Sequence, residues 1–344
     1  MTLENRLQAF IKLGQQLQSL SPDQVQELAQ QARRYNAWFD EPNVQQALTS
    51  IASQLNEAQL RAWLANYPVT TTVQPRKVGV VMAGNIPLVG FHDLLTVLLS
   101  GNYLYAKLSS EDTFLPKWLV QQLISIEPDF KDFVLFVDLL KDVDAVIATG
   151  SDNTARYFEY YFAKKPHIIR RNRSSVAVLT GFESPEELAK LGNDIFQYYG
   201  LGCRNVSKML VPEGFTVDTL LKSLEPFKWV MHHHKYANNY DYNRSILLVN
   251  QTPHFDNGFL LLTENKQLVS PISVVHLEYY QDQKDLKQKL AAQGDKIQCV
   301  VSALGWYENS VPFGEAQCPT VNQYADNVDT LAFLLSLDHL PEAS

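Results

Sequence analysis

The chain has 344 residues, of which 46% are hydrophobic and 19% charged, and its formal net charge is −8. This length and composition predict a globular α/β or similar protein with about two domains. A net negative charge argues against a protein that binds nucleic-acid duplexes, because such binding depends on a basic surface. We therefore expect no nucleic-acid partner.

The start of the chain and its cysteines bear on its compartment. The first fifteen residues include Glu4 and no long apolar run, so they do not look like a signal peptide. No stretch reaches roughly 18 consecutive apolar residues, the length that a membrane-spanning helix needs. The cysteines are far apart and lack metal-ligand spacing; they are Cys203, Cys299 and Cys318. These features predict a cytoplasmic protein with no membrane span, no metal and no disulfide framework.

The first sixty or so residues predict helices, because apolar positions recur with a helical period. Ser21-Pro22-Asp23 supplies an N-cap followed by a proline for one of these helices. Beyond Pro75, short apolar runs rich in β-branched residues alternate with helical stretches. The predicted strands are 78–82, 103–108, 134–137 and 145–148, with helices at 91–99 and 115–126 between them. Such alternation indicates a parallel, doubly wound sheet.

A second unit is predicted to begin near Ser174, with a strand at 176–179, a helix from Ser184 to about Tyr198, and a strand at 208–211. Apolar runs at 246–249, 260–262 and 272–277 continue the alternation. We therefore expect an α/β protein with three parts. They are an N-terminal helical region at 1–65, a first α/β domain at 66–173 to which about 300–344 return, and a second α/β domain at 174–299.

The strongest local motif is Gly200-Leu201-Gly202-Cys203-Arg204-Asn205, between a predicted helix and a predicted strand. Glycines permit close backbone approach, which suits a thiol presented to a ligand. A thiolate attacks carbonyl carbon well, and the thioester that results accepts hydride readily. Arg204 could favour the thiolate of Cys203 electrostatically. The alternative interpretation is a buried structural cysteine, as we expect for Cys299 and Cys318.

Polar residues also follow the predicted strands of the first sheet. Gly84-Asn85-Ile86-Pro87 follows the first strand, where ligands of open α/β sheets bind. The Asn85 amide could donate to an oxyanion, although asparagine is also a common turn residue. Lys107 is followed by Ser109 and Ser110, which could hold ribose hydroxyls or a 2′-phosphate.

Gly150 and Ser151 precede a predicted helix, whose N-terminus could bind a pyrophosphate. Ser151 could equally be an ordinary helix cap. The histidine run at 232–234 is not interpreted as a metal site, because consecutive side chains point in different directions. The aromatic run at 157–162 is interpreted as a core or subunit-facing helix surface, so a homo-oligomer is one expectation.

Taken together, the order and spacing of these motifs resemble the aldehyde-dehydrogenase superfamily. The stretch Ala-Gly-Asn-Ile-Pro-Leu-Val-Gly-Phe-His-Asp-Leu-Leu at 83–95 is closer to one branch, the acyl-CoA reductases of the LuxC type. Members of that branch make aldehydes from long-chain acyl thioesters. The resemblance covers residues 75–280, and it implies the two-domain fold of that superfamily: a doubly wound nucleotide-binding domain and a second, catalytic α/β domain.

The resemblance also implies roles for single residues. Cys203 matches the nucleophile, and Asn85 matches the oxyanion donor that works with the backbone N–H of Cys203. The implied cofactor-binding residues are Gly84, Lys107, Ser109, Ser110, Gly150 and Ser151. Ser110 stands where the family often has a glutamate that repels a 2′-phosphate. NADPH is therefore favoured over NADH.

Two departures from the family imply the direction of the reaction. Hydrolytic members carry a Glu-Leu-Gly-Gly motif, and the stretch Arg170–Ser174 that stands in its place has no carboxylate. Hydrolysis of an acyl-enzyme should then be slow, whereas acyl transfer from a thiol still works. Lys266–Pro271 likewise replaces an acidic pair that contacts the nicotinamide ribose. The arginines of 170–173 could meet CoA phosphates, but a solvated basic turn is the favoured interpretation.

The predicted function is therefore reduction of an acyl-CoA, or of another acyl thioester, to the aldehyde. Two alternatives stay open. One is an acyl-phosphate reductase of the same fold, and the other is a degenerate relative that binds a nucleotide without catalysis. The presence of both Cys203 and Asn85 argues against the second alternative.

Overall fold

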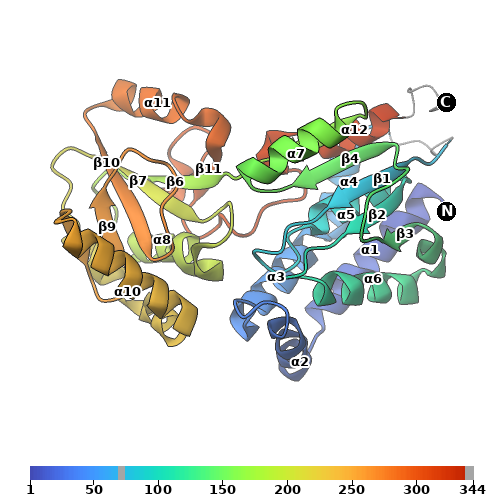
Figure 1. Ribbon diagram of the computed structural model, residues 1–344, viewed down its shortest axis with the longest axis horizontal. Helices are drawn as coiled ribbons and strands as arrows, with labels where there is room; N and C mark the ends of the chain where they lie inside the picture. Colours follow the sequence, from blue (N-terminus) through green and yellow to red (C-terminus); the bar gives the residue numbers. More distant parts are fainter. Residues whose placement is uncertain (69–73, 338–344) are drawn as a thin grey trace. The chain divides into compact units, whose positions relative to one another are not determined.

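The structure is a computed structural model that describes residues 1–68 and 74–337 (Figure 1). The chain divides into two compact units. Unit 1 comprises Met1–Asn172 together with the chain from Pro319 onward, and unit 2 comprises Arg173–Cys318. No helix within 1–68 and 74–337 combines the length and the hydropathy that crossing a bilayer requires.

Unit 1 begins with the predicted helical region. Its helices are α1 (Leu3–Gln18), α2 (Pro22–Arg33), α3 (Glu41–Gln54) and α4 (Glu57–Leu64). The predicted cap at Ser21 is confirmed: the Ser21 side chain accepts from the Gln24 N–H, and the Gln24 side chain accepts from the Ser21 N–H. This reciprocal pairing satisfies two backbone donors that a helix N-terminus otherwise leaves open.

The sheet of unit 1 is parallel throughout its described strands, in the order β3-β2-β1-β4-β5. The strands are β1 (Lys77–Val81), β2 (Tyr103–Lys107), β3 (Val134–Phe136), β4 (Ala145–Thr149) and β5 (His167–Arg170). The helices that follow them are α5 (Phe91–Ser100), α6 (Phe114–Ile126) and α7 (Asp152–Phe162), with a 3-10 turn at Pro128–Asp132. The predicted doubly wound sheet is confirmed, while β5 was not predicted.

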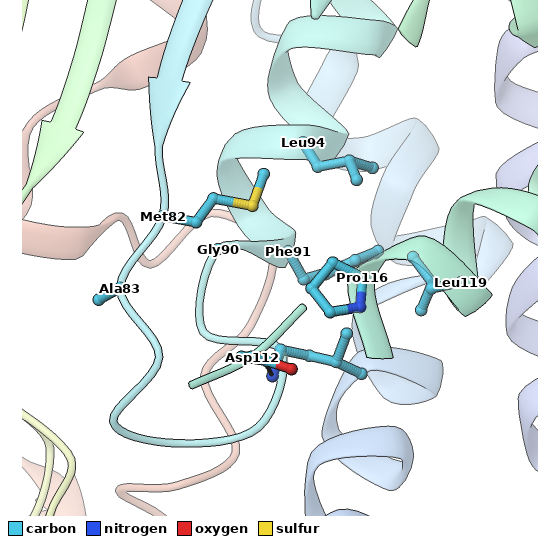
Figure 2. Close-up of a pocket in the computed structure, with 9 residues that line it drawn as sticks. Met82, Ala83, Gly90, Phe91, Leu94, Asp112, Pro116 and Leu119 are labelled. Atoms are coloured by element: carbon cyan, nitrogen blue, oxygen red, sulfur yellow. Dashed lines mark hydrogen bonds between the residues drawn. The ribbon is translucent and has the colours of Figure 1, made fainter. Parts of the chain in front are cut away.

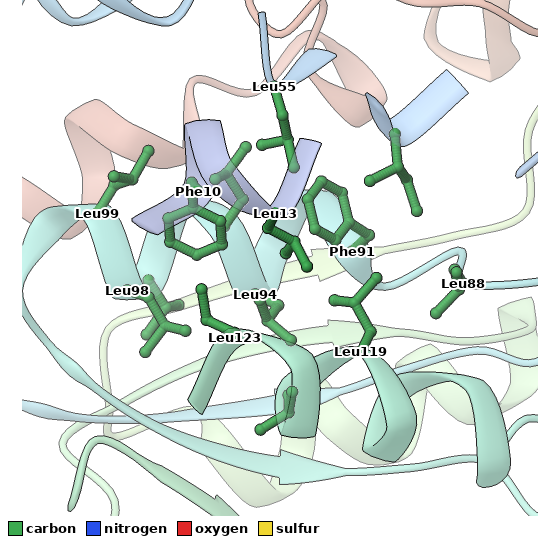
Figure 3. Close-up of a cluster of buried hydrophobic side chains, with 14 of the residues drawn as sticks. Phe10, Leu13, Leu55, Leu88, Phe91, Leu94, Leu98, Leu99, Leu119 and Leu123 are labelled. Carbon is green, nitrogen blue, oxygen red and sulfur yellow. The ribbon is translucent and has the colours of Figure 1, made fainter. Parts of the chain in front are cut away.

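Both faces of this sheet are buried, because its strands alternate between two apolar clusters. Ala145 and Ile147 of β4 belong to a large core shared with α1, α5 and α6. Figure 3 shows this core, with Phe10 and other apolar side chains packed together. Val146 and Ala148, one residue out of phase, belong to a smaller cluster with the aromatic side chains of α7. This double burial explains why the strands are apolar without alternation.

The chain returns to unit 1 at Pro319 and ends its described part with α12 (Thr330–Ser336). Side chains of α4 and the following turn hold this segment. The indole N–H of Trp63 donates to the Tyr324 hydroxyl at 2.8 Å, and the Tyr67 hydroxyl donates to Asp329 Oδ2 at 2.7 Å. The return was expected at about residue 300. It starts later because residues 297–302 pair with unit 2, as described below.

A buried ion pair also fixes α12. Arg170, the last residue of β5, is 4% exposed, and its Nη1 lies 2.5 Å from Asp93 Oδ2 of α5. Its Nη2 donates to the Thr330 hydroxyl at 2.8 Å. The interpretation of Arg170 as part of a solvated basic turn is therefore wrong. In contrast, Arg171 is exposed and pairs with Glu159.

Unit 2 is a second α/β sheet, in the order β12-β11-β6-β7-β10-β9-β8. Its strands are β6 (Ser174–Val178), β7 (Val206–Pro212), β8 (His254–Asp256), β9 (Leu261–Glu264), β10 (Val274–Tyr280), β11 (Ile297–Ser302) and β12 (Val311–Pro312). Its helices are α8 (Pro185–Phe196), α9 (Asp218–Ser223), α10 (His234–Val249) and α11 (Gln283–Ala291). The described pairs are parallel except β8 with β9.

Two expectations for unit 2 are corrected. The apolar run at 246–249 is the last turn of α10, because a run of four residues cannot distinguish a strand from the end of a helix. Residues 297–302 form β11, which pairs with β6 in the sheet of unit 2, so the second unit extends beyond residue 299.

We predict that breaking the buried pair in unit 1 strongly destabilises the protein. Arg170→Met leaves the Asp93 carboxylate buried without its cation, which typically costs about 3 to 5 kcal/mol. Urea unfolding with an intrinsic probe of unit 1 would measure this loss. Glu57→Gln, which removes an exposed partner of Arg61, is the control and should change the free energy of unfolding by less than about 1 kcal/mol. Equal effects of the two substitutions would contradict the prediction.

Candidate active site

The chain reaches Cys203 through a left-handed turn. Tyr198, Tyr199 and Gly200 have φ values of 53°, 56° and 79°. This region is uncommon for residues other than glycine, and a non-glycine residue there typically costs about 1 to 3 kcal/mol. Both tyrosines are buried, and the Tyr199 ring lies 4.5 Å from the ring of His233 between centroids. Burial of the aromatic rings therefore offsets the strain and keeps the turn in place.

The side chain of Asn205 closes the same turn. Its Oδ1 accepts from the Gly202 N–H at 2.8 Å, and its Nδ2 donates to the carbonyl oxygen of Gln197 at 2.8 Å. Nδ2 also lies within hydrogen-bond distance of the carbonyl of Asp194 at the end of α8. Asn205 is 2% exposed, so water does not compete for these bonds. The sequence motif included Asn205 but gave it no role; asparagine in a glycine-containing turn is the signal that pointed to it.

Cys203 is half-buried at the end of this turn. Its carbonyl oxygen accepts from the Ser175 hydroxyl at 3.1 Å, and this hydroxyl also lies 3.1 Å from the thiol of Cys299. Burial raises the pKa of Cys299, while Arg204 and the hydrogen bond from Ser175 lower it. Arg204 thus acts electrostatically on Cys299. The expected support of Arg204 for a Cys203 thiolate stays a prediction.

In unit 1, the loop after β1 carries Gly84 and Asn85. The Asn36 amide donates to the carbonyl of Gly84 at 3.0 Å, so the loop between α2 and α3 holds it from one side. A Cβ atom at Gly84 would lie 2.7 Å from Ser109 Oγ and 3.1 Å from the backbone nitrogen of Asp112. Only glycine permits this close approach between the loops after β1 and β2. Asn85 itself is half-buried.

The other predicted cofactor residues follow β2 and β4. Lys107 ends β2, and its Nζ donates to the carbonyl of Asp138 at 2.7 Å. Ser110 is exposed. After β4, the Ser151 hydroxyl accepts from the Thr154 N–H at 3.3 Å and caps α7, so the capping interpretation of this serine is confirmed. A helix N-terminus also attracts anions.

The strand order places these residues at one edge. Val81 of β1 pairs with Lys107 of β2 and with Ala148 of β4, so the carboxyl ends of the three strands coincide. The connections run outward in opposite directions from β1 and β4, which makes this edge the switch point of the sheet. Gly84, Lys107, Gly150 and the N-terminus of α7 therefore lie at the edge where ligands of open α/β sheets bind.

Lys266–Pro271, which replaces the family's acidic pair, is held by side chains of the sheet of unit 2. The Lys208 ammonium donates to the carbonyl of Lys266 at 2.8 Å, and the His276 ring hydrogen-bonds the carbonyl of Gln267 at 2.9 Å. Lys208 is 2% exposed and forms an ion pair with Glu278. Sequence reasoning missed these residues, although a lysine within an apolar strand was the available signal.

The histidine run at 232–234 does not bring metal ligands together. The His233 ring stacks on the ring of His234 with centroids 5.2 Å apart, and it packs at a tilt against the Tyr199 ring with centroids 4.5 Å apart. Within 1–68 and 74–337, no group of three or more His, Cys, Asp or Glu side chains could hold a metal ion.

A buried carboxyl group ties the end of unit 2 to the helix that precedes Cys203. Asp194 of α8 is fully buried, and its oxygens accept from the Gly314 N–H at 2.7 Å and the Ala316 N–H at 3.0 Å. Burial raises its pKa to about 7, although these two hydrogen bonds act in the opposite direction.

We predict that Asp194 makes the stability of the protein depend on pH. The folded pKa lies above the ordinary value of 3.8, so the folded protein binds more protons between these values. The contribution of Asp194 is therefore fully present below about pH 4 and declines by up to about 4 kcal/mol as pH rises to about 7. Unfolding titrations of wild type and Asp194→Asn from pH 4 to 8 would measure it. A stability difference between the two proteins that stays constant over this range would contradict the prediction; Asp295→Asn, an exposed change, serves as control.

Comparisons with known proteins identify the family. The family model described as acyl-CoA reductase (LuxC) matches residues 5–212, more than half of the chain. A long-chain acyl-protein thioester reductase from Aliivibrio fischeri is 27% identical over 144 residues. That match covers 38% of this chain and 30% of the relative, so the chain matches less than a third of the relative's length.

Solved structures show the fold. A variant of an aldehyde dehydrogenase from Bacillus cereus has a TM-score of 0.63 at 16% identity, covering 90% of this chain and 72% of the other. An aldehyde dehydrogenase from Mycobacterium tuberculosis, described in complex with NAD+, has a TM-score of 0.60 at 12% identity, covering 88% and 73%. The predicted resemblance is confirmed on both counts: the chain has the aldehyde-dehydrogenase fold and belongs to the LuxC family of acyl-CoA reductases.

Proposed function

We propose that the protein reduces an acyl thioester to the aldehyde, with Cys203 as nucleophile and a reduced nicotinamide dinucleotide as co-substrate. The observation that carries this proposal is the strained turn of Tyr198–Gly200, closed by Asn205, which ends at a half-buried thiol. Strained backbone that is held on several sides is characteristic of functional positions. Family membership and the acyl-protein thioester reductase among the relatives support the substrate class.

The chain's own residues would act as follows. The Cys203 thiolate attacks the thioester carbonyl, and the Asn85 amide and the Cys203 N–H donate to the oxyanion. The C–S bond to the leaving thiol breaks, and the acyl group remains on Cys203. When bound, a reduced nicotinamide would supply a hydride to the carbonyl carbon of this thioester, which gives the anion of a hemithioacetal on Cys203. Breaking the C–S bond to Cys203 then releases the aldehyde and restores the thiolate.

The residues at the switch point of unit 1 would hold the cofactor. Lys107 and Ser110 would lie at the adenosine ribose, and Gly150 with the N-terminus of α7 would hold the pyrophosphate. Gly84 keeps the loop after β1 close to Ser109, so that the backbone at this edge is compact.

The stretch that joins β5 to β6 supports reduction of the acyl-enzyme over its hydrolysis. Arg170–Ser174 contains no carboxylate, and Arg170 is engaged with Asp93 and Thr330. Without a general base in this stretch, attack of water on the acyl-enzyme is not assisted. The acyl-enzyme therefore persists until a thiol or a hydride reaches it.

Loss of the thiol tests the reaction. Cys203→Ala should abolish NADPH oxidation at 340 nm with every acyl-CoA in a panel of chain lengths, because no acyl-enzyme can form. Cys318→Ala, an exposed cysteine of the same unit, is the matched control and should retain activity. Free thiol should appear with each turnover. Full activity of Cys203→Ala would refute the mechanism, and turnover of acyl phosphates alone would replace the thioester by an acyl phosphate.

The cofactor form has its own test. Because Ser110 is exposed and carries no carboxylate, its side chain does not itself repel a 2′-phosphate. We expect kcat/KM for NADPH to exceed that for NADH, and Ser110→Glu to reverse the preference by about tenfold or more through one like-charge contact. A higher kcat/KM for NADH in the wild type would contradict this prediction.

A further inference from the structure

The loop that carries Asn85 rests on a small cavity with one carboxyl group in its wall (Figure 2). The cavity leaves about 10 Å³, room for no more than one water molecule. Apolar residues of α5, of α6 and of the loop after β1 line it, with Met82 and Phe91 among them, and the exception is Asp112. Asp112 is 4% exposed, and its Oδ1 has no hydrogen-bond partner among the residues that the structure describes. Burying a carboxyl group in an apolar cavity wall costs free energy, so the presence of Asp112 there requires an explanation.

The carboxyl group of Asp112 forms a hydrogen bond with the loop that carries Asn85. Its Oδ2 accepts from the Leu88 N–H at 2.7 Å. Leu88 has a φ of 57°, which is unfavourable for a leucine, and its side chain is buried. The hydrogen bond from Leu88 to a buried carboxyl group therefore offsets backbone strain at the point where the loop turns into α5.

Asn85 lies between two such anchors. On one side, the Asn36 amide donates to the carbonyl of Gly84 at 3.0 Å. On the other side, Asp112 holds the N–H of Leu88, three residues after Asn85. Pro87, between them, further limits the backbone. With both ends fixed, the backbone of Asn85 has little freedom to move, so the position from which its amide donates is defined.

We propose that Asp112 is a positioning residue for the reaction, because its carboxyl group fixes the loop from which the Asn85 amide donates to the oxyanion. This inference rests on the proposed function, which assigns that donation to Asn85. Oxyanion donors act through preorganised geometry, and a displacement of about 1 Å can reduce a rate by about 100-fold.

The ionisation of Asp112 gives the proposal a pH signature. Burial raises its pKa to about 7, and the Leu88 N–H acts in the opposite direction. The other residues that line the cavity carry no titratable side chain, so no neighbouring charge in that wall sets this value. The ionised carboxylate accepts more strongly than the neutral group, so acyl transfer should rise as pH increases through about 7.

The experiment compares two reactions of Cys203 in the full-length protein. Acylation by an acyl-CoA builds an oxyanion, whereas alkylation by iodoacetamide displaces iodide without one. Asp112→Leu removes the acceptor at similar size, and we expect it to slow acylation about 10- to 100-fold. Alkylation should stay within about twofold, since it gains nothing from an oxyanion donor. Asp112→Asn retains an acceptor and should recover most of the rate while losing the step near pH 7.

The matched control is Asp144, whose carboxylate accepts from the Lys77 N–H at 2.7 Å, at the amino end of β1. Asp144→Leu removes the same kind of bond at the opposite edge of the sheet and should leave acylation unchanged. In addition, Asn85→Ala combined with Asp112→Leu should be no slower than Asn85→Ala alone, because the two residues act through one donor.

Equal acylation rates for wild type and Asp112→Leu would overturn the proposal, and so would multiplicative losses in the double variant. If the wild type is not acylated by any thioester, the proposed function fails. Hydrogen exchange of a peptide covering 83–90 then decides the role of Asp112 by itself. Faster exchange in Asp112→Leu but not in Asp144→Leu supports the anchor, and unchanged exchange overturns it.

Discussion

The hydrogen bonds of the Asn205 side chain are the interaction on which the presentation of Cys203 depends. One amide group joins the end of α8, the left-handed turn and the start of β7. Without it, the Gly202 N–H would lose the acceptor that it has in the structure, and a buried donor that loses its partner typically costs about 1 to 3 kcal/mol. The strain at Tyr198 and Tyr199 persists because these bonds and the aromatic packing hold the turn from both sides.

In unit 1, buried polar side chains likewise hold a loop by bonding to its backbone. Its loop after β1 is held by one amide, Asn36, and by one carboxyl group, Asp112, both of which bind backbone atoms. In both units, then, buried polar side chains bond to the main chain of the loop that carries the proposed reactive group. Precise geometry in the two loops comes from these supports more than from the residues that would perform the chemistry.

The sequence predicted the parts of the structure that depend on local patterns. Strands buried on both faces, capped helices at Ser21 and Ser184, and the glycine turn before Cys203 all follow from residue type and period. It failed where partners are distant in the chain. The pairing of β11 with β6 spans more than a hundred residues, and nothing in residues 297–302 identifies its neighbour. Arg170 looked like a surface residue because its partner, Asp93, is 77 residues away. Asp112 was missed for the same reason. Its role as a hydrogen-bond acceptor is visible only in the structure, where it accepts from the Leu88 N–H.

The late return of the chain to unit 1 has a consequence for biosynthesis. Tyr324, Asp329 and α12 complete a unit whose first helices are made more than 250 residues earlier. On the ribosome, the whole of unit 2 emerges before the partners of Trp63 and Tyr67 exist. Until then, the surface of α4 and α5 that this segment covers stays exposed, and exposed apolar surface makes a nascent chain prone to aggregation. Unit 1 is begun before unit 2 and completed after it, so the completion of its fold reports that unit 2 has already been synthesised.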